Sequence, residues 1–168
     1  MAIPLPPVRR LVTSHNDEGQ AVVARDSQIT SELLPHGAGS VVIWSSASSP
    51  ADVDSKGDKG LDDTGFVNDG SIFRIVDVPP RSVGALHRSL SLDYIIVQRG
   101  TVTLTLDDGS RTKVYQGEFV VQNATMHGWD NDTDEWVRFV AIMMPAKAPI
   151  VGGQALQTDL SALFGPGS

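Results

Sequence analysis

The stretch GALHRSLSLDYIIVQRG, residues 84–100, decides the fold prediction because it places chemically reactive side chains directly before and within an apolar strand. His87 is followed six residues later by Asp93. Side chains alternate between the two faces of a strand, so Asp93 should share a face with Ile95 and Val97. A carboxylate among apolar neighbours on an inner face is costly unless something pairs with it. The pattern therefore predicts a buried site as well as a core strand.

A second stretch, NATMHGWDN at residues 123–131, contains the last histidine of the chain, His127. Trp129 has the same parity as His127, so both side chains should lie on one face of a later strand. If that strand and the one that carries Asp93 line a single barrel, the imidazoles of His87 and His127 converge with the carboxylate inside it.

The rest of the chain is also β-like, because proline and glycine divide it into short pieces with frequent turn signals. Roughly ten strands of this kind predict an all-β antiparallel sandwich or barrel. TVTLTL at residues 101–106 alternates with a period of two, and the following DG dipeptide is a hairpin signal. Near the end we expect a short helix, with Asp159 as its cap and Gly165 as its stop.

One domain is expected over residues 1–168, with a core at about 71–145 and an N-terminal extension, residues 1–70, packed on it. The extension adds strands such as SVVIWSS at residues 40–46. Residues 47–70 are rich in Ser, Asp, Lys and Gly, which predicts a long polar loop. We interpret this loop as an irregular surface excursion, with a lid over a pocket as the alternative.

Composition excludes several classes of protein. The net charge of −7 argues against a nucleic-acid partner. The absence of cysteine rules out disulfides, thiolate nucleophiles and Cys-ligated metals, so any metal needs histidine and carboxylate ligands. No apolar run approaches the length of a membrane span, and the N-terminus lacks the apolar core of a signal peptide, so we expect no membrane partner and a cytoplasmic location. His15 and His36 lie in turn-like contexts and are expected at the surface.

The two histidine stretches together resemble the cupin superfamily, small β-barrels of the jelly-roll type. The family's first motif has glycine, two spaced histidines, glutamate and glycine, and its second has glycine, proline, glycine, histidine and asparagine. The resemblance covers less than half of the chain, from about residue 73 to 144. The matching positions are Gly84, His87, Ser89, Asp93 and Gly100, then Gly117, Gln122, Ala124, His127 and Asn131.

The departures from the family pattern concern the metal ligands. A cupin metal site usually has three histidines and one glutamate, whereas this chain has Ser89 at the second histidine and Asp93 at the glutamate. The resemblance implies that His87, Asp93 and His127 form a two-histidine, one-carboxylate set for a divalent metal: Fe, Mn, Ni or Zn. A competing hypothesis is metal-free acid–base chemistry, with one histidine as the base and Asp93 as its orienting group. A third has both histidines satisfied inside the barrel without chemistry.

Three further residues are candidates for substrate binding. Gln122 leads toward His127 and offers an amide, or else is a strand-end amide that meets water. Trp129 walls the pocket or fills the core. Arg138, on the face of Trp136 and Val140, suits a substrate carboxylate, with a structural salt bridge as the alternative. Tyr94 should face away from the pocket.

These observations favour a small-molecule cupin enzyme, and we expect a lyase or isomerase that decarboxylates or dehydrates an organic acid or carbonyl compound such as a secondary-metabolite intermediate. A non-haem iron dioxygenase with the same three residues is the alternative enzyme. A non-catalytic small-ligand binding module is the alternative from another class. The resemblance also implies a homodimer formed through sheet edges.

Overall fold

The structure, a computed structural model, describes residues 3–35, 37–54 and 57–165, and these ranges form thirteen β-strands and one short helix. The prediction of an all-β fold with a short C-terminal helix is therefore confirmed. The elements are β1 (Val8–His15), β2 (Ala21–Ile29), β3 (Glu32–Leu33), β4 (Gly39–Ser46), β5 (Ser71–Val78), β6 (Ser91–Arg99), β7 (Thr101–Leu106), β8 (Arg111–Tyr115), β9 (Phe119–Asn123), β10 (His127–Asp130), β11 (Val137–Pro145), β12 (Ile150–Val151), β13 (Gln154–Ala155) and α1 (Ser161–Phe164).

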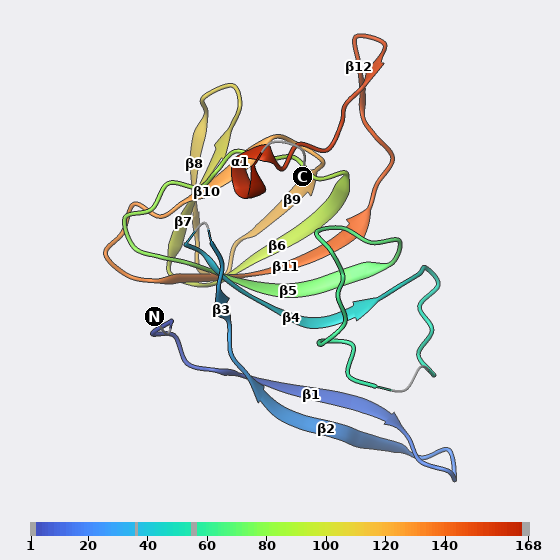
Figure 1. Cartoon of the computed structure of the whole chain (residues 1–168). Helices are drawn as coiled ribbons and strands as arrows, with labels where there is room; N and C mark the ends of the chain where they lie inside the picture. Colours follow the sequence, from blue (N-terminus) through green and yellow to red (C-terminus); the bar gives the residue numbers. More distant parts are fainter. Residues whose placement is uncertain (1–2, 36, 55–56, 166–168) are drawn as a thin grey trace.

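Two antiparallel sheets build the barrel (Figure 1). The larger has six strands in the order β3-β4-β5-β11-β6-β9, and the smaller has three in the order β10-β7-β8. Their inner faces share one hydrophobic core, which combines residues of the larger sheet such as Ile95 and Phe139 with Val102, Val114 and Trp129 of the smaller. Burial of this apolar surface between the sheets is the main force that holds them together.

Strand β6 follows the alternation expected from its sequence. Asp93, Ile95 and Val97 are buried at 4%, 3% and 1% exposure, whereas Tyr94 is 43% exposed. The strand ends where Gly100 adopts a φ of 83°, a backbone conformation that favours glycine, and β7 begins immediately afterwards. The carboxylate therefore lies on the inner face of the barrel, as the period of two predicts.

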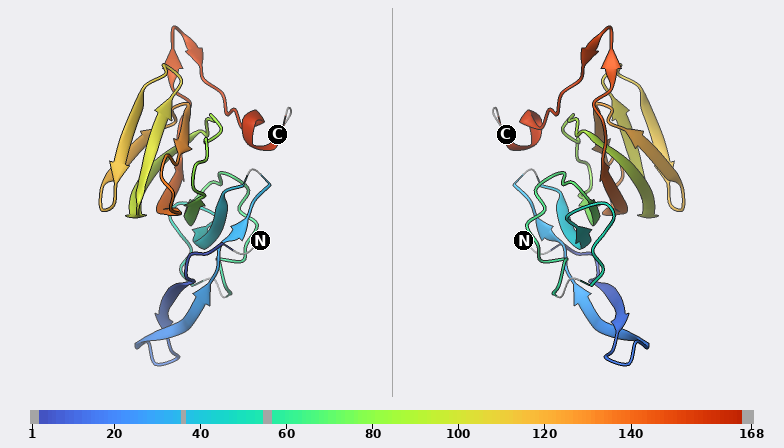
Figure 2. Two further views of the ribbon diagram at one scale, coloured as in Figure 1. Left: turned by 90° about the vertical axis from the view of Figure 1, so that its left-hand side faces the viewer. Right: turned by 90° about the vertical axis from the view of Figure 1, so that its right-hand side faces the viewer.

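The N-terminal segment contacts the barrel at few points. Ile3 and Leu5 are buried, and the carbonyl of Pro6 accepts a hydrogen bond of 2.9 Å from Nη1 of Arg138. The β1–β2 hairpin extends away from the two sheets (Figures 1 and 2), and it is fastened to the loop after β4 by the ion pair of Arg10 with Asp58. The hairpin and that loop therefore brace each other.

The two histidines expected at the surface lie away from the barrel interior or outside the described ranges. His15 ends β1 and is exposed, and His36 lies outside the described residues. The short helix has Leu160 and not Asp159 as its N-cap, so the predicted cap is wrong by one residue, although the amide of Ser161 donates to Oδ1 of Asp159 at 3.2 Å. Gly165 ends the helix, as predicted. No helix within the described ranges is long and apolar enough to cross a membrane.

Candidate functional site: a histidine pair in a buried pocket

A pair of backbone hydrogen bonds brings the two barrel histidines together. The amide of His87 donates to the carbonyl of His127 at 2.9 Å, and the amide of His127 donates back at 3.0 Å. Two residues that exchange hydrogen bonds across an antiparallel bridge project their side chains to the same face. The imidazole ring centroids consequently lie 4.3 Å apart.

A glycine makes this close approach of the two chain segments feasible. A Cβ atom on Gly84 would lie 2.4 Å from the backbone nitrogen of Trp129 and 2.6 Å from its oxygen. The amide of Gly84 also donates to the buried carboxylate of Asp130 at 2.7 Å. The first glycine of the motif is thus required by backbone contact with β10, three residues before His87.

The second motif has a similar local explanation. Ala124 adopts a φ of 49°, in the left-handed region that favours glycine, at the position where cupins usually have glycine. Asn131 is fully buried, and its Nδ2 donates to the carbonyls of Val78 and Glu135. Asn131 therefore fastens the loop after β10 to β5 and has a structural role.

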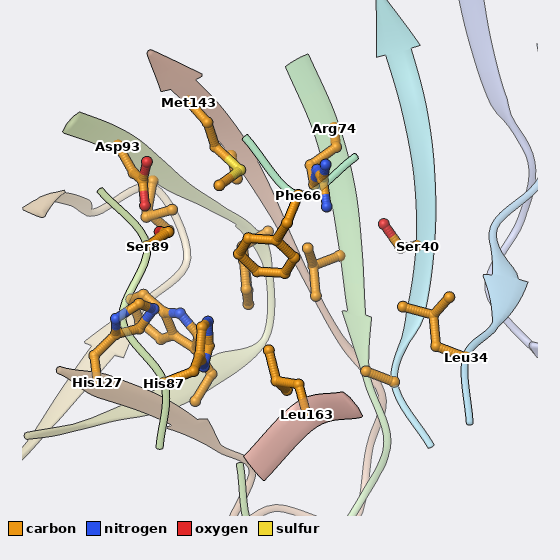
Figure 3. Close-up of a pocket in the computed structure, with 16 residues that line it drawn as sticks. Leu34, Ser40, Phe66, Arg74, His87, Ser89, Asp93, His127, Met143 and Leu163 are labelled. Carbon is orange, nitrogen blue, oxygen red and sulfur yellow. The ribbon is translucent and has the colours of Figure 1, made fainter. Parts of the chain in front are cut away.

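The histidine pair opens onto a pocket of about 110 Å³ in the barrel interior (Figure 3). A second chamber of about 140 Å³ adjoins it and shares His87, Trp129, Phe139 and Leu163 with it. Space of this size holds several water molecules or a small organic ligand. The polar side chains that line the first pocket are those of Ser40, Arg74, His87, Ser89, Asp93 and His127.

Each of the two imidazole rings has its Nδ1 next to a backbone carbonyl. Nδ1 of His87 lies 2.9 Å from the carbonyl of Ala85, which makes Nδ1 the donor and puts the basic lone pair on Nε2. Nδ1 of His127 lies 3.0 Å from the carbonyl of Thr125, and the amide nitrogen of Gln122 lies 2.6 Å from Nδ1 and 2.7 Å from Nε2 of the same ring. Burial, and to a smaller extent the charge of His87, lower the pKa of His127 to about 4. His127 is therefore neutral near neutral pH.

Asp93 is buried in the same pocket, and its surroundings only partly offset the cost of burying its negative charge. Burial raises its pKa to about 6, and a hydrogen bond with Ser91 and the positive charge of Arg74 oppose that rise only in part. Its Oδ1 has no hydrogen-bond partner among the described residues. Ser89 hydrogen-bonds Ser91, with 2.8 Å between the hydroxyl oxygens, so the serine at the missing ligand position is tied to the hydroxyl that contacts Asp93.

Some features of the site suit a divalent metal and others do not. Both rings are held through Nδ1 by backbone carbonyls, which is a common arrangement for metal-binding histidines. However, the amide nitrogen of Gln122 lies against both ring nitrogens of His127, and within the described ranges no three His, Asp or Glu side chains are placed so that they could hold a metal ion. The three residues do not fit a metal in this arrangement, and metal binding by His87, Asp93 and His127 stays a prediction.

The structure brings only one of the three expected substrate-binding residues into the pocket lining. Trp129 lines both chambers and packs edge-on against His127, with ring centroids 5.9 Å apart. Gln122 is buried directly across the sheet from Asp93, but its amide contacts His127 and it does not line the pocket. A role for Trp129 or Gln122 in binding substrate stays a prediction.

The placement of Arg138 corrects the sequence interpretation. Its guanidinium forms two hydrogen bonds with Asp77, at 2.6 and 2.8 Å, and it lies outside the lining of both chambers. Because side chains alternate along β11, Arg138 shares the outer face of the sheet with Val140, whereas Phe139 points into the pocket. The salt-bridge alternative is therefore correct, and the pocket contains a different arginine.

That arginine is Arg74 of β5, which sequence reasoning missed. Its guanidinium carbon lies 5.5 Å from the ring centroid of Phe66, a residue of the polar loop at residues 47–70. The available signal was an arginine between two apolar residues of equal parity, Ile72 and Val76, in a strand. Phe66 also meets His87 edge-on at 5.7 Å, so part of the loop covers the pocket, and the lid alternative describes this part correctly.

Comparison with known proteins shows which family the chain belongs to. No protein-family model matches the chain. The chain is 34% identical over 139 residues to the cupin-domain-containing oxidoreductase virC of Hypocrea virens. The aligned region covers 77% of this chain and 72% of the relative. The chain is 28% identical over 170 residues to the cupin-domain-containing oxidoreductase fogC of Aspergillus ruber, which covers 93% and 81%.

A solved structure shows the same architecture. The polyketide cyclase RemF from Streptomyces resistomycificus aligns with a TM-score of 0.51 and 16% identity over 80% of both chains, a likeness that concerns the fold alone. Two facing antiparallel sheets around a histidine-containing pocket define a jelly-roll barrel built for a small molecule. With the relatives above, the chain belongs to the cupin superfamily.

Proposed function

We propose that the protein is a small-molecule enzyme of secondary metabolism, of lyase or isomerase type, that acts on an organic acid or carbonyl compound. The observation that carries the proposal is the bridged pair of His87 and His127, which shares one buried pocket with Asp93. A barrel core needs none of these polar groups for its stability, and burying them is unfavourable. Their convergence supports a chemical role.

The relatives support the setting of this proposal. Besides the two oxidoreductases, the chain is 37% identical over 92 residues to the phomopsin biosynthesis cluster protein D of Diaporthe leptostromiformis, about half of that relative's length. It is also 27% identical over 165 residues to the oryzines biosynthesis cluster protein J of Aspergillus oryzae. Names of this kind favour a biosynthetic enzyme for small organic molecules.

The chain's own residues suggest how proton transfer would occur. In dehydration or isomerisation, Nε2 of His87 can accept the proton next to a carbonyl, while Nδ1 is held by the carbonyl of Ala85. In decarboxylation the C–C bond to the departing carbon dioxide breaks, the electron pair forms an enolate, and His87 protonated at Nε2 would return a proton to its carbon. Burial favours the protonated form of Asp93, whose pKa is about 6, and its Oδ1 lacks a partner among the described residues. In that protonated form the carboxyl can donate a hydrogen bond to a substrate oxygen on which negative charge develops. The apolar walls exclude water, which strengthens both interactions.

The names of the relatives specifically favour one second candidate, an oxidoreductase. In that case the same pocket would hold the substrate while oxygen is consumed. The two candidates differ in oxygen uptake. A decarboxylase or dehydratase consumes no oxygen, whereas an oxygenase consumes oxygen together with its substrate.

The test uses the full-length protein and benzoylacetate, an aromatic β-keto acid, in a sealed cell that records oxygen and carbon dioxide. We expect release of carbon dioxide without oxygen uptake, and loss of this activity in His87→Gln. His15→Gln is the matched control because His15 is an exposed histidine outside the pocket. Metal content is measured on the same samples, and near-stoichiometric metal that is absent from His127→Ala would support the metal hypothesis.

Three outcomes would count against the lyase proposal. Oxygen uptake that matches turnover would replace it with the oxidoreductase candidate. Equal turnover in wild type and His87→Gln would remove the histidine from the mechanism. Binding of benzoylacetate and related acids without conversion would favour the non-catalytic binding module.

A further inference from the structure

Two arginines of the described residues, Arg10 and Arg138, are buried, and each has a carboxylate partner. Arg10 is 7% exposed and contacts both carboxylate oxygens of Asp58, at 2.7 and 2.5 Å. Arg138 is 6% exposed and contacts both carboxylate oxygens of Asp77. The fold thus gives each fully buried guanidinium a two-point carboxylate partner, which is the geometry that best compensates its loss of water.

Arg74 departs from this pattern. It is partly buried on the inner face of β5, and no carboxylate of the described residues comes within 4.0 Å of it. Its Nε is buried without a hydrogen-bond partner, and its Nη2 makes a single long contact of 3.4 Å with the carbonyl of Gly65. Asp93 attracts it across the pocket but forms no ion pair with it. The guanidinium therefore retains donors directed at the cavity.

The residues around Arg74 indicate what kind of ligand would fit beside it. The guanidinium lies over the ring of Phe66, and Trp129, Phe139 and Met143 line the same pocket. Figure 3 shows Arg74 on one side of the cavity, the two histidines on the opposite side and Phe66 between them. An elongated molecule with an anionic end and a flat apolar body would match this distribution.

We propose that Arg74 is the anion-binding residue of the pocket, and that the ligand is a small aromatic monocarboxylic acid whose carboxylate contacts Arg74 while the carbonyl group that reacts faces His87 and His127. A carboxylate would supply the two-point partner that Arg10 and Arg138 find within the chain. The inference rests on the proposed function, since it names the substrate class of the same site.

The experiment measures binding of benzoate, phenylacetate and cinnamate to the full-length protein, each beside its primary amide. The amides keep the shape and lose the charge, so the difference isolates the contribution of Arg74. Titration is followed by amide NMR signals, with those of His127 and Trp129 as reporters of the pocket. We expect at least one acid to bind saturably and on the order of tenfold to a hundredfold more tightly than its amide, the range for charge-assisted hydrogen bonds.

Variants assign that preference to the residue. Arg74→Gln should bind acid and amide equally, and Arg74→Lys should keep a reduced preference because it retains the charge and loses the planar fork. Arg99→Gln, at an exposed arginine outside this pocket, is the control and should match wild type. Unfolding curves confirm that each variant folds; if Arg74→Gln does not fold, the acid–amide comparison in wild type and in Arg74→Lys decides.

Equal binding of acids and amides to wild type, no binding of any acid, or a preserved preference in Arg74→Gln would overturn the inference. These failures differ from failure of the proposed function. Acid binding without conversion of benzoylacetate would support the Arg74 site and refute the proposed enzymatic function. Conversion of benzoylacetate without any preference for acids over amides would support the enzymatic function and refute the Arg74 site.

Discussion

Replacement of Asp93 by asparagine tests the electrostatics of the pocket most directly. Burial raises the pKa of this carboxyl from 3.8 to about 6, so the native state holds the charged form poorly. Asparagine has nearly the same shape and never carries the charge. We expect Asp93→Asn to be more stable than wild type at pH 7, which is unusual for a change at a buried polar residue.

The magnitude follows from the shift. The interval from 3.8 to about 6, at about 1.4 kcal/mol per pH unit, corresponds to about 3 kcal/mol. Because the native pKa is raised, the stabilising contribution is complete below about pH 4 and is lost as the pH rises through 6. Asp93 is 4% exposed, so solvent screening reduces this value little. The variant should gain on wild type through this window and reach a constant advantage above about pH 7.

The assay is urea unfolding of wild type and variant at pH values from about 4 to 8, analysed as the difference between the two free energies of unfolding. The difference cancels other titrating groups, including His127, whose lowered pKa acts in the opposite direction by destabilising the native state as the pH falls from 6.5 toward 4. Asp134→Asn is the control. Its exposed carboxylate is paired with Arg81, which lowers its pKa, so that variant should show a small difference of the opposite sign.

A variant that is less stable than wild type at pH 7, or a difference that does not change with pH, would refute this reasoning. Such a result would mean that the native protein stabilises the carboxylate. Repeating the measurement with a chelator separates the causes, since a bound cation stabilises a neighbouring carboxylate and its removal would restore the expected sign.

Two further predictions concern packing and assembly. Gly84→Ala should lower the free energy of unfolding by about 1–3 kcal/mol, because the new methyl group would overlap the backbone of Trp129, and unchanged urea unfolding would contradict the contact. The homodimer expected from the sequence, formed through sheet edges, stays a prediction. The outer face of the larger sheet is a second candidate surface, because Phe73, Tyr94 and Val121 are exposed there at 37%, 43% and 59%. Light scattering should show a dimer that Tyr94→Glu shifts to monomer, and a monomeric wild type would be the opposing result.

Much of the site could be predicted because its rules are local. Alternation along β6 places Asp93 and Tyr94 on opposite faces, and the apolar Ile95 and Val97 mark the face of Asp93 as the inner one. The glycines of the two motifs mark turns and close approaches whose geometry depends on a few neighbouring residues. The helix near the end and the loop at residues 47–70 follow from equally local signals, and the structure has both.

The assignments that were wrong or missing depend on contacts between distant segments. Alternation puts Arg138 and Val140 on one face of β11, but only the stacking of the sheets decides that this face is the outer one, where Asp77 lies directly across from Arg138. The contact of the Gln122 amide with His127 likewise forms only in the fold, and a role of Gln122 in substrate binding stays a prediction. In both cases a polar group found its partner within the chain.

The sequence by itself determined an all-β fold and the inward direction of Asp93, because strand periodicity acts over a few residues. Its resemblance to cupins implied that the two histidine-bearing segments meet inside one barrel. Only the tertiary structure decided which polar groups remain without a partner inside the barrel. Arg138 has its carboxylate in Asp77, whereas Arg74 faces the cavity with an unmatched donor, and partner choice of this kind depends on residues that are far apart in the chain and adjacent only after folding.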